Sequence, residues 1–179
     1  METWVEQREA FQGPVFTVVT GEAVLDDGQR ARRDVVRHRG GVGVVPVLDG
    51  QVLLVRQFRI AVERDTIEIP AGLREPGETL EACAARELAE EVGYAAKRLI
   101  PLLNYCTSPG FTDESTAIFL ALDLHPVAAT PDWDERIHQV ALPLATLPEA
   151  LANGTFEDGK TVIGLYAALA WLNATPAEG

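Results

Sequence analysis

The stretch that decides the fold is residues 72–94, which read GLREPGETLEACAARELAEEVGY. Apolar residues recur along it at four-residue steps: Leu80, Ala84, Leu88 and Val92. This spacing places them on one helix face, and Gly93 is a typical C-terminal cap. The pattern predicts a helix over residues 79–92, preceded by a turn at the adjacent proline and glycine, positions 76 and 77.

Three glutamates share one face of this predicted helix: Glu87, Glu90 and Glu91. Like charges at these spacings destabilise a helix, so such a face is normally either a solvated surface or a cation-binding site. The spacing alone leaves both interpretations open. Glu78 lies near the helix start, where the helix dipole favours a carboxylate, and it could pair with Arg86.

The segments around the helix predict an α+β domain. Runs of β-branched residues predict strands over much of residues 15–60, with a hairpin at Asp49-Gly50. A short strand at residues 66–69 ends at Pro70, where we expect a loop to begin. Beyond the helix the pattern predicts three strands and two helices: residues 99–106, 116–122, 137–142, 147–153 and 160–172. We expect a strand-rich appendage at residues 1–40 and the main domain at residues 41–179.

Composition excludes several classes of protein. The chain has 179 residues, of which 47% are apolar, enough to bury one core and to exclude disorder as a whole. Lys and Arg number 15 against 27 Asp and Glu, and a net charge of -12 argues against binding to nucleic acid or to anionic membranes. The two cysteines, Cys83 and Cys106, form no redox or zinc motif, and no segment resembles a targeting signal or a membrane span. We therefore expect a cytoplasmic protein.

Read as G-x5-E-x7-R-E-U-x-E-E-x-G-U, where U is a bulky apolar residue, residues 72–94 resemble the Nudix box of the Nudix hydrolases. Its seven fixed residues are Gly72, Glu78, Arg86, Glu87, Glu90, Glu91 and Gly93. At typical residue usage, a chance match has odds on the order of 10⁻⁸ per starting point. Tyr94 departs from the family's usual aliphatic residue, at a position that serves packing.

The resemblance implies an α/β/α sandwich with a mixed central sheet and an N-terminal antiparallel appendage. It also implies hydrolysis of a nucleoside diphosphate linked to another moiety, with Mg²⁺ as the cofactor and Mn²⁺ as a possible substitute. The metal ligands in such enzymes correspond to the Ala71 carbonyl, Glu87, Glu90 and Glu91, supported by Glu78 and Arg86. The chemistry agrees, because an anionic pyrophosphate needs oxygen-ligated cations to approach carboxylates.

Segments outside the box are similar to the ADP-ribose pyrophosphatases: VRQFR at 55–59, EIPAG at 68–72, SPGFTDE at 108–114 and the acidic residues 132–135. This similarity implies hydrolysis of ADP-ribose to AMP and ribose 5-phosphate. The alternatives are a pyrophosphatase for other nucleotide sugars or dinucleotides, such as GDP-mannose or NADH, and a sensor that binds ADP-ribose without cleaving it. By the same similarity six residues are expected around the substrate: Arg56, Arg59, Glu68, Pro109, Gly110 and Trp133.

Taken without the resemblance, these residues have simpler interpretations. The two arginines could be solvated on an edge strand, and Glu68 could face solvent between Ile67 and Ile69. Pro109-Gly110 could be only a turn.

The sequence leaves open which residue acts as the general base. Related enzymes carry glutamates spaced two apart in a loop after the box, and here Trp133 and Glu135 occupy those positions. Tryptophan cannot accept a proton, although it could close over the adenine or simply pack. The candidates for the base are Glu90, Glu114, Asp134 and Glu135, unless the ions alone generate hydroxide.

The N-terminal strands carry apolar residues such as Trp4, Phe11 and Phe16, but no chemistry of their own. In the resembling family such an appendage exchanges between two subunits, which implies a homodimer. Apolar residues on poorly covered strands also need burial, which favours association independently. The alternative is a lid within a monomer.

Overall fold

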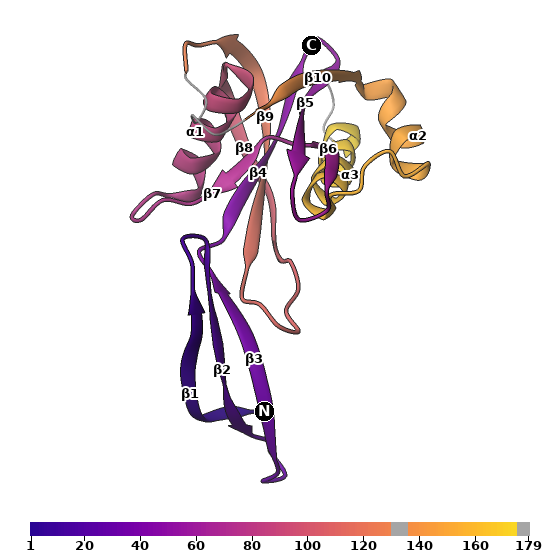
Figure 1. Ribbon diagram of the computed structural model, residues 1–179. Coiled ribbons are helices and arrows are strands. Elements are labelled where there is room, and N and C mark those ends of the chain that lie inside the picture. The colour runs from indigo at the N-terminus through magenta and orange to yellow at the C-terminus, as the bar shows by residue number, and fades with distance from the viewer. Residues whose placement is uncertain (130–135, 175–179) are drawn as a thin grey trace. The chain divides into compact units, whose positions relative to one another are not determined.

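A computed structural model describes residues 1–129 and 136–174. The chain divides into two compact units, Met1–Gly40 with Tyr105–Thr116, and Gly41–Asn104 with Ala117–Gly179. Among the described residues, each unit is built on its own sheet, and Figure 1 labels the strands and helices.

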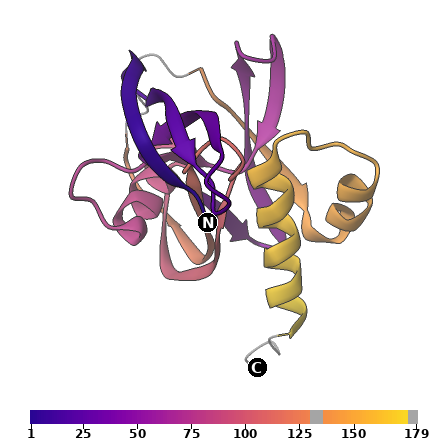
Figure 2. The same ribbon diagram turned by 90° about the horizontal axis from the view of Figure 1, so that it is seen from below.

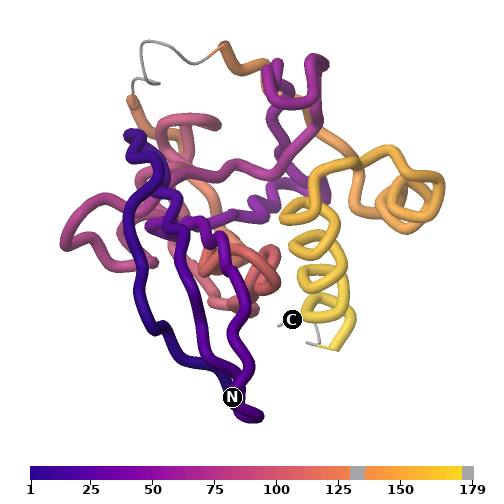
Figure 3. Tube along the Cα trace, turned by 60° about the horizontal axis from the view of Figure 1, so that its bottom comes forward, coloured from indigo at the N-terminus to yellow at the C-terminus, as the bar shows by residue number. Residues whose placement is uncertain are grey.

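The first unit contains an antiparallel sheet in the order β1-β2-β3 (Figure 3). Its strands are β1 (Thr3–Gln12), β2 (Phe16–Val24) and β3 (Arg30–His38). The predicted antiparallel appendage is therefore confirmed. Apolar side chains stay exposed on this sheet: Val5, Phe11 and Phe16 are 46%, 53% and 40% exposed.

The segment Tyr105–Thr116 joins the first unit through hydrogen bonds to β3. The Val36 N–H donates to the Phe111 carbonyl at 2.8 Å. The Asp113 carboxylate accepts from the His38 N–H at 2.9 Å and from Arg37 Nη1 at 3.1 Å. Burial raises the pKa of Asp113, but these bonds and the Arg37 charge outweigh it and hold the pKa below its usual range.

The second unit is built on a seven-stranded sheet in the order β10-β5-β4-β9-β8, with β6 paired to β5 and β7 paired to β4. The strands are β4 (Gly41–Leu48), β5 (Gln51–Arg59), β6 (Arg64–Glu68), β7 (Ala71–Leu73), β8 (Tyr94–Cys106), β9 (Ser115–Pro126) and β10 (His138–Pro143). The helices are α1 (Leu80–Val92), α2 (Leu147–Ala152) and α3 (Gly159–Ala174), with a 3-10 turn, η1 (Leu144–Thr146).

Helices α1 and α3 lie on opposite faces of this sheet (Figure 1, Figure 2). The alternation of strand side chains explains the arrangement, because neighbouring residues of a strand point to opposite faces. Val42 and Val44 of β4 belong to a buried cluster with Leu88 of α1. Val45 instead faces Gly164 of α3, where an added Cβ would lie 3.3 Å from Val45 Cγ2. Three layers result, and the predicted α+β class is confirmed.

The predicted central helix is confirmed as α1, with both of its ends capped. The Thr79 side chain accepts a hydrogen bond from the Ala82 N–H at 3.1 Å. Gly93 ends the helix in the left-handed conformation with φ 73°, which favours glycine. The helix therefore begins and ends where its sequence signals place it.

The break predicted at Pro70 is present but short: β6 ends at Glu68, and β7 begins at Ala71 and pairs with β4. Two other expectations about the strands were wrong. Strand β8 begins at Tyr94, directly after the helix cap, and not near residue 99. Strand β5 is not at an edge, because it pairs with β4, β6 and β10.

In the part of the chain that the structure describes, every helix is too short or too polar to span a lipid bilayer.

Candidate functional site

Arg86 of α1 binds three glutamates of the predicted box. Its Nε and Nη2 donate to Glu78 Oε1 and Oε2 at 3.0 and 3.1 Å. Its Nη1 donates to Glu87 Oε1 at 2.7 Å and to Glu90 Oε2 at 3.1 Å. The structure thus contains the Glu78–Arg86 pair that the sequence suggested. Hydrogen bonds from Arg86 lower the pKa of Glu78 to about 2, so that carboxylate is ionised at neutral pH.

Two carboxylates of α1, those of Glu87 and Glu91, are buried against the backbone of β7. They are 6% and 5% exposed. Glu91 Oε2 accepts from the Ala71 N–H at 3.0 Å. A Cβ on Gly72 would overlap the Glu87 carboxylate, so glycine is what allows that carboxylate to lie against the strand. Strand β7 and helix α1 therefore bring Ala71, Glu87 and Glu91 together.

The donors gathered here fit a hard divalent cation, because Mg²⁺ takes carboxylate and carbonyl oxygens as its ligands. Because Gly72 has no side chain, the Glu87 carboxylate occupies the space that a Cβ would fill. In this structure the Arg86 guanidinium holds Glu87 and Glu90. Within the described ranges, no three acidic, His or Cys side chains stand at the spacing of a formed metal site.

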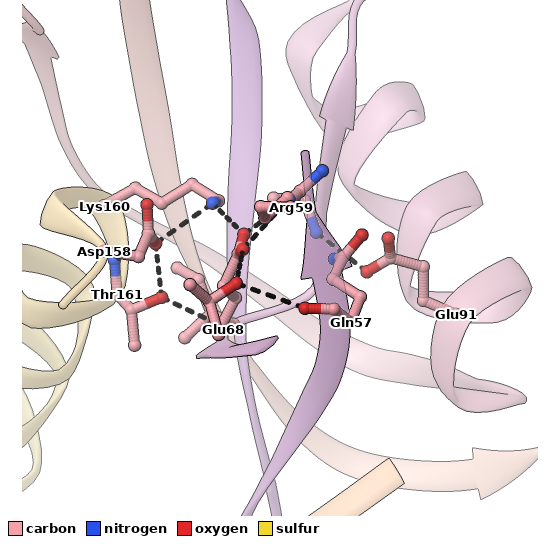
Figure 4. A network of polar contacts seen from close by, with 10 residues as sticks. Gln57, Arg59, Glu68, Glu91, Asp158, Lys160 and Thr161 are labelled. Carbon is pink, nitrogen blue, oxygen red and sulfur yellow. Dashed lines mark hydrogen bonds and ion pairs between the residues drawn. The ribbon is translucent and has the colours of Figure 1, made fainter. Parts of the chain in front are cut away.

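A second polar network surrounds Glu68 (Figure 4). Arg59 Nε and Nη2 donate to Glu68 Oε1 and Oε2, each at 2.7 Å. Thr66 Oγ1 donates to Oε1 at 2.6 Å, and Lys160 Nζ donates to Oε2. The interpretation that Glu68 faces solvent is wrong, since its side chain is only 3% exposed. Burial raises its pKa, but the Arg59, Lys160 and Thr66 contacts outweigh it and bring the pKa to about 2.

Sequence reasoning missed Lys160 and Asp158, which complete this network from the start of α3. Lys160 Nζ lies 3.0 Å from Asp158 Oδ2. Asp158 Oδ2 also accepts from the Thr161 N–H at 3.0 Å, the bond of an N-terminal cap. An acidic residue just before a predicted helix is a signal for such a cap. Nothing local connects Lys160 to Glu68, which is 92 residues away in the chain.

Arg56 is another predicted substrate residue of the second unit. Arg56 is three residues before Arg59 on β5, so the two side chains leave opposite faces of the strand. Arg56 lines a hollow of about 290 Å³ together with Asp65, Thr66, Ile67, Thr155 and Glu157. Arg56 and Arg59 therefore do not share one surface.

Pro109, Gly110 and Glu114 belong to the first unit. The Phe111 N–H donates to the Ser108 carbonyl at 3.1 Å, so Pro109-Gly110 do form a turn. Glu114 Oε2 accepts from Thr107 Oγ1 at 2.7 Å, and Oε1 lies 3.6 Å from His38 Nδ1. The remaining predicted residues, Trp133, Asp134 and Glu135, lie outside the described residues.

The model of the NUDIX domain matches residues 37–163 of this chain, a range that includes both networks. The chain belongs to the Nudix family. The resemblance carried by residues 72–94 is therefore confirmed, and with it the prediction that the chain is a Nudix hydrolase.

Individual relatives also match most of the chain. An "ADP-ribose pyrophosphatase" of Bacillus subtilis is 40% identical over 135 residues, covering 75% of this chain and 73% of that protein. A "Methanol dehydrogenase activator" of Bacillus methanolicus is 34% identical over 167 residues, covering 92% and 90%. The crystal structure of an ADP compounds hydrolase aligns with a TM-score of 0.85 at 29% identity, covering 97% of this chain and 95% of that one. The predicted Nudix-type sandwich with a mixed sheet is thus confirmed.

Proposed function

We propose that this Nudix hydrolase cleaves the pyrophosphate bond of ADP-ribose, releasing AMP and ribose 5-phosphate. The observation that carries the proposal is the pair of buried carboxylates, Glu87 and Glu91, packed against β7 with Arg86 binding the neighbouring glutamates. Two relatives named for ADP-ribose or ADP compounds support this substrate class.

The cofactor in this proposal is Mg²⁺, with Mn²⁺ as a substitute. Glu87, Glu90, Glu91 and the Ala71 carbonyl would hold it. When bound, a divalent cation lowers the pKa of a water molecule and neutralises charge on the phosphates. Arg86 orients Glu87 and Glu90 through its hydrogen bonds and offsets part of their mutual repulsion.

The substrate residues in the proposal are those predicted from the resemblance. Arg59 is best placed among them, because its guanidinium is partly exposed and offers the planar donors that bind phosphate. The resemblance also names Glu68, Pro109, Gly110 and Trp133, and Arg56, whose side chain leaves the opposite face of β5 from that of Arg59. The general base is sought among Glu90, Glu114, Asp134 and Glu135.

A substrate panel tests the activity. The purified protein is incubated with ADP-ribose, NADH, GDP-mannose or nucleoside triphosphates, with Mg²⁺, Mn²⁺ or EDTA. A phosphatase specific for monoesters then releases phosphate from any products. We expect ADP-ribose to be cleaved fastest and EDTA to abolish cleavage. Preference for another substrate contradicts the assignment, and binding of ADP-ribose without cleavage favours a sensor.

We also propose that the protein is a cytoplasmic homodimer. The exposed apolar side chains of the β1–β3 sheet support association, because water-exposed patches of this kind favour burial against a second copy. The two cysteines are free, Cys83 buried and Cys106 exposed, which suits a reducing compartment.

A further inference from the structure

The guanidinium of Arg59 is only partly used inside the protein. Nε and Nη2 donate to the two oxygens of Glu68. In residues 1–129 and 136–174, no hydrogen-bond or ion-pair partner is found for Nη1. The Arg59 side chain is 43% exposed, whereas that of Glu68 is 3% exposed. The arginine is therefore held on its buried side, and donors remain for a ligand.

Glu68 is in turn fixed by the start of α3. Lys160 Nζ donates to the same oxygen, Oε2, that accepts from Arg59 Nη2. Lys160 is 18% exposed and also pairs with Asp158. Two cations and two carboxylates thus balance around the buried Glu68, as a buried charge requires. Lys160 and Thr66 thus restrain the Glu68 carboxylate independently of Arg59.

The exposed end of Arg59 lies near the box helix. Figure 4 shows Arg59 between Glu68 and Glu91, the buried glutamate of α1. The Glu68 hydrogen bonds raise the pKa of Arg59, and the negative charges of Glu91 and Asp158 add to this effect. Arg59 therefore stays charged beside Glu91, one of the proposed metal ligands.

We propose that Glu68 and Lys160 are positioning residues that fix the Arg59 guanidinium so that Nη1 binds a phosphate oxygen of a nucleoside diphosphate. The inference rests on the proposed function in taking a nucleoside diphosphate compound as the ligand. It adds a role for Lys160, which belongs to the start of α3 and not to the box. Neither residue touches the reacting atoms in this proposal.

Calorimetric titration with ADP in Mg²⁺ tests the inference, because ADP contains the diphosphate. Lys160→Met should weaken ADP binding about tenfold, as expected when a charge-assisted hydrogen bond to the ligand is loosened. Lys160→Arg keeps the cation and should bind within about twofold of the wild type. Unchanged binding by Lys160→Met overturns the proposal, and so does a wild type that does not bind ADP.

A matched control separates positioning from simple docking of β6 on α3. Arg64 Nε donates to Glu157 Oε2 at 2.8 Å, which also joins β6 to the residues just before α3. Among the described residues, neither member of this pair hydrogen-bonds to Glu68. Glu157→Gln should leave ADP binding unchanged. An equal loss in Glu157→Gln and Lys160→Met would show that docking, and not the placement of Arg59, sets the affinity. Thermal unfolding of each variant verifies that it is folded.

Steady-state kinetics with ADP-ribose distinguish this inference from the proposed function. In Lys160→Met we expect KM to rise about tenfold while kcat stays within about twofold. If the wild type cleaves ADP-ribose but Lys160→Met has an unchanged KM, the function stands and the inference fails. If the wild type cleaves nothing while ADP binding still depends on Lys160, the function fails and the inference stands.

Discussion

Gly72 lacks a side chain at the point where the carboxylate of Glu87 lies. The two residues belong to β7 and α1, and a Cβ on Gly72 would overlap both carboxylate oxygens of Glu87. Since β7 pairs with β4 through Gly72 and Val42, the backbone cannot move away without loss of sheet pairing. The carboxylate would have to move instead.

Gly72→Ala should therefore displace Glu87 and lower kcat on ADP-ribose, by about a hundredfold if the shift approaches 1 Å. Calorimetric titration with Mn²⁺ should show weaker binding by the same variant. The control is Gly159→Ala, because its added methyl group meets nothing within 4 Å. Wild-type activity and Mn²⁺ affinity in Gly72→Ala would show that the position of the Glu87 carboxylate does not matter.

Glu91→Gln should abolish most of the activity while the fold is kept. The amide oxygen can still accept from the Ala71 N–H, but the charge that would bind a cation is gone. We expect kcat to fall by at least about a hundredfold with little change in the thermal midpoint. Glu81→Gln, on the exposed first turn of the same helix, should retain wild-type kinetics. An active Glu91→Gln variant would remove Glu91 from the metal ligands.

Glu68 should make the stability of the protein depend on acid pH. Its pKa is about 2 in the folded chain against an ordinary value of 4.5, so the unfolded state binds protons more tightly between these values. Stability is therefore lost as the pH falls from about 4.5 to about 2. The loss from this group is up to about 3 kcal/mol.

Denaturant unfolding of the wild type and Glu68→Gln at a series of pH values measures this contribution. The difference in the free energy of unfolding between the two proteins should be largest at neutral pH and should shrink towards pH 2. Two parallel curves would mean that the Glu68 carboxylate is not stabilised by its partners.

Phe11→Glu should convert the proposed dimer into monomers. The rings of Phe11 and Phe16 lie 5.7 Å apart on the first unit, and a charge placed there would oppose burial against a second copy. Light scattering after size exclusion should give twice the chain mass of 19.4 kDa for the wild type and one chain mass for the variant. Phe58→Glu, at a 58% exposed position of the second unit, should remain dimeric. A monomeric wild type contradicts the proposal.

The features that could be predicted from the sequence are those encoded over a few residues. The four-residue repeat from Leu80 to Val92, with Thr79 before it and Gly93 after it, determined helix α1, because helix spacing and caps depend on neighbours within a turn. The same local spacing gathered Glu87, Glu90 and Glu91 on one face and identified the family. Strand β7 escaped prediction because its pairing with β4, more than 25 residues earlier, has no local signal.

Relations between distant segments were decided by the tertiary structure alone. Glu68 looks solvent-exposed in an alternating strand, yet packing against α3 buries it with Lys160. Tyr105–Thr116 joins the first unit because its backbone bonds to β3, which no residue pattern in either segment reveals. Spacing along the chain fixes which side chains share a helix face, whereas the partner of a buried charge depends on which elements the core brings into contact.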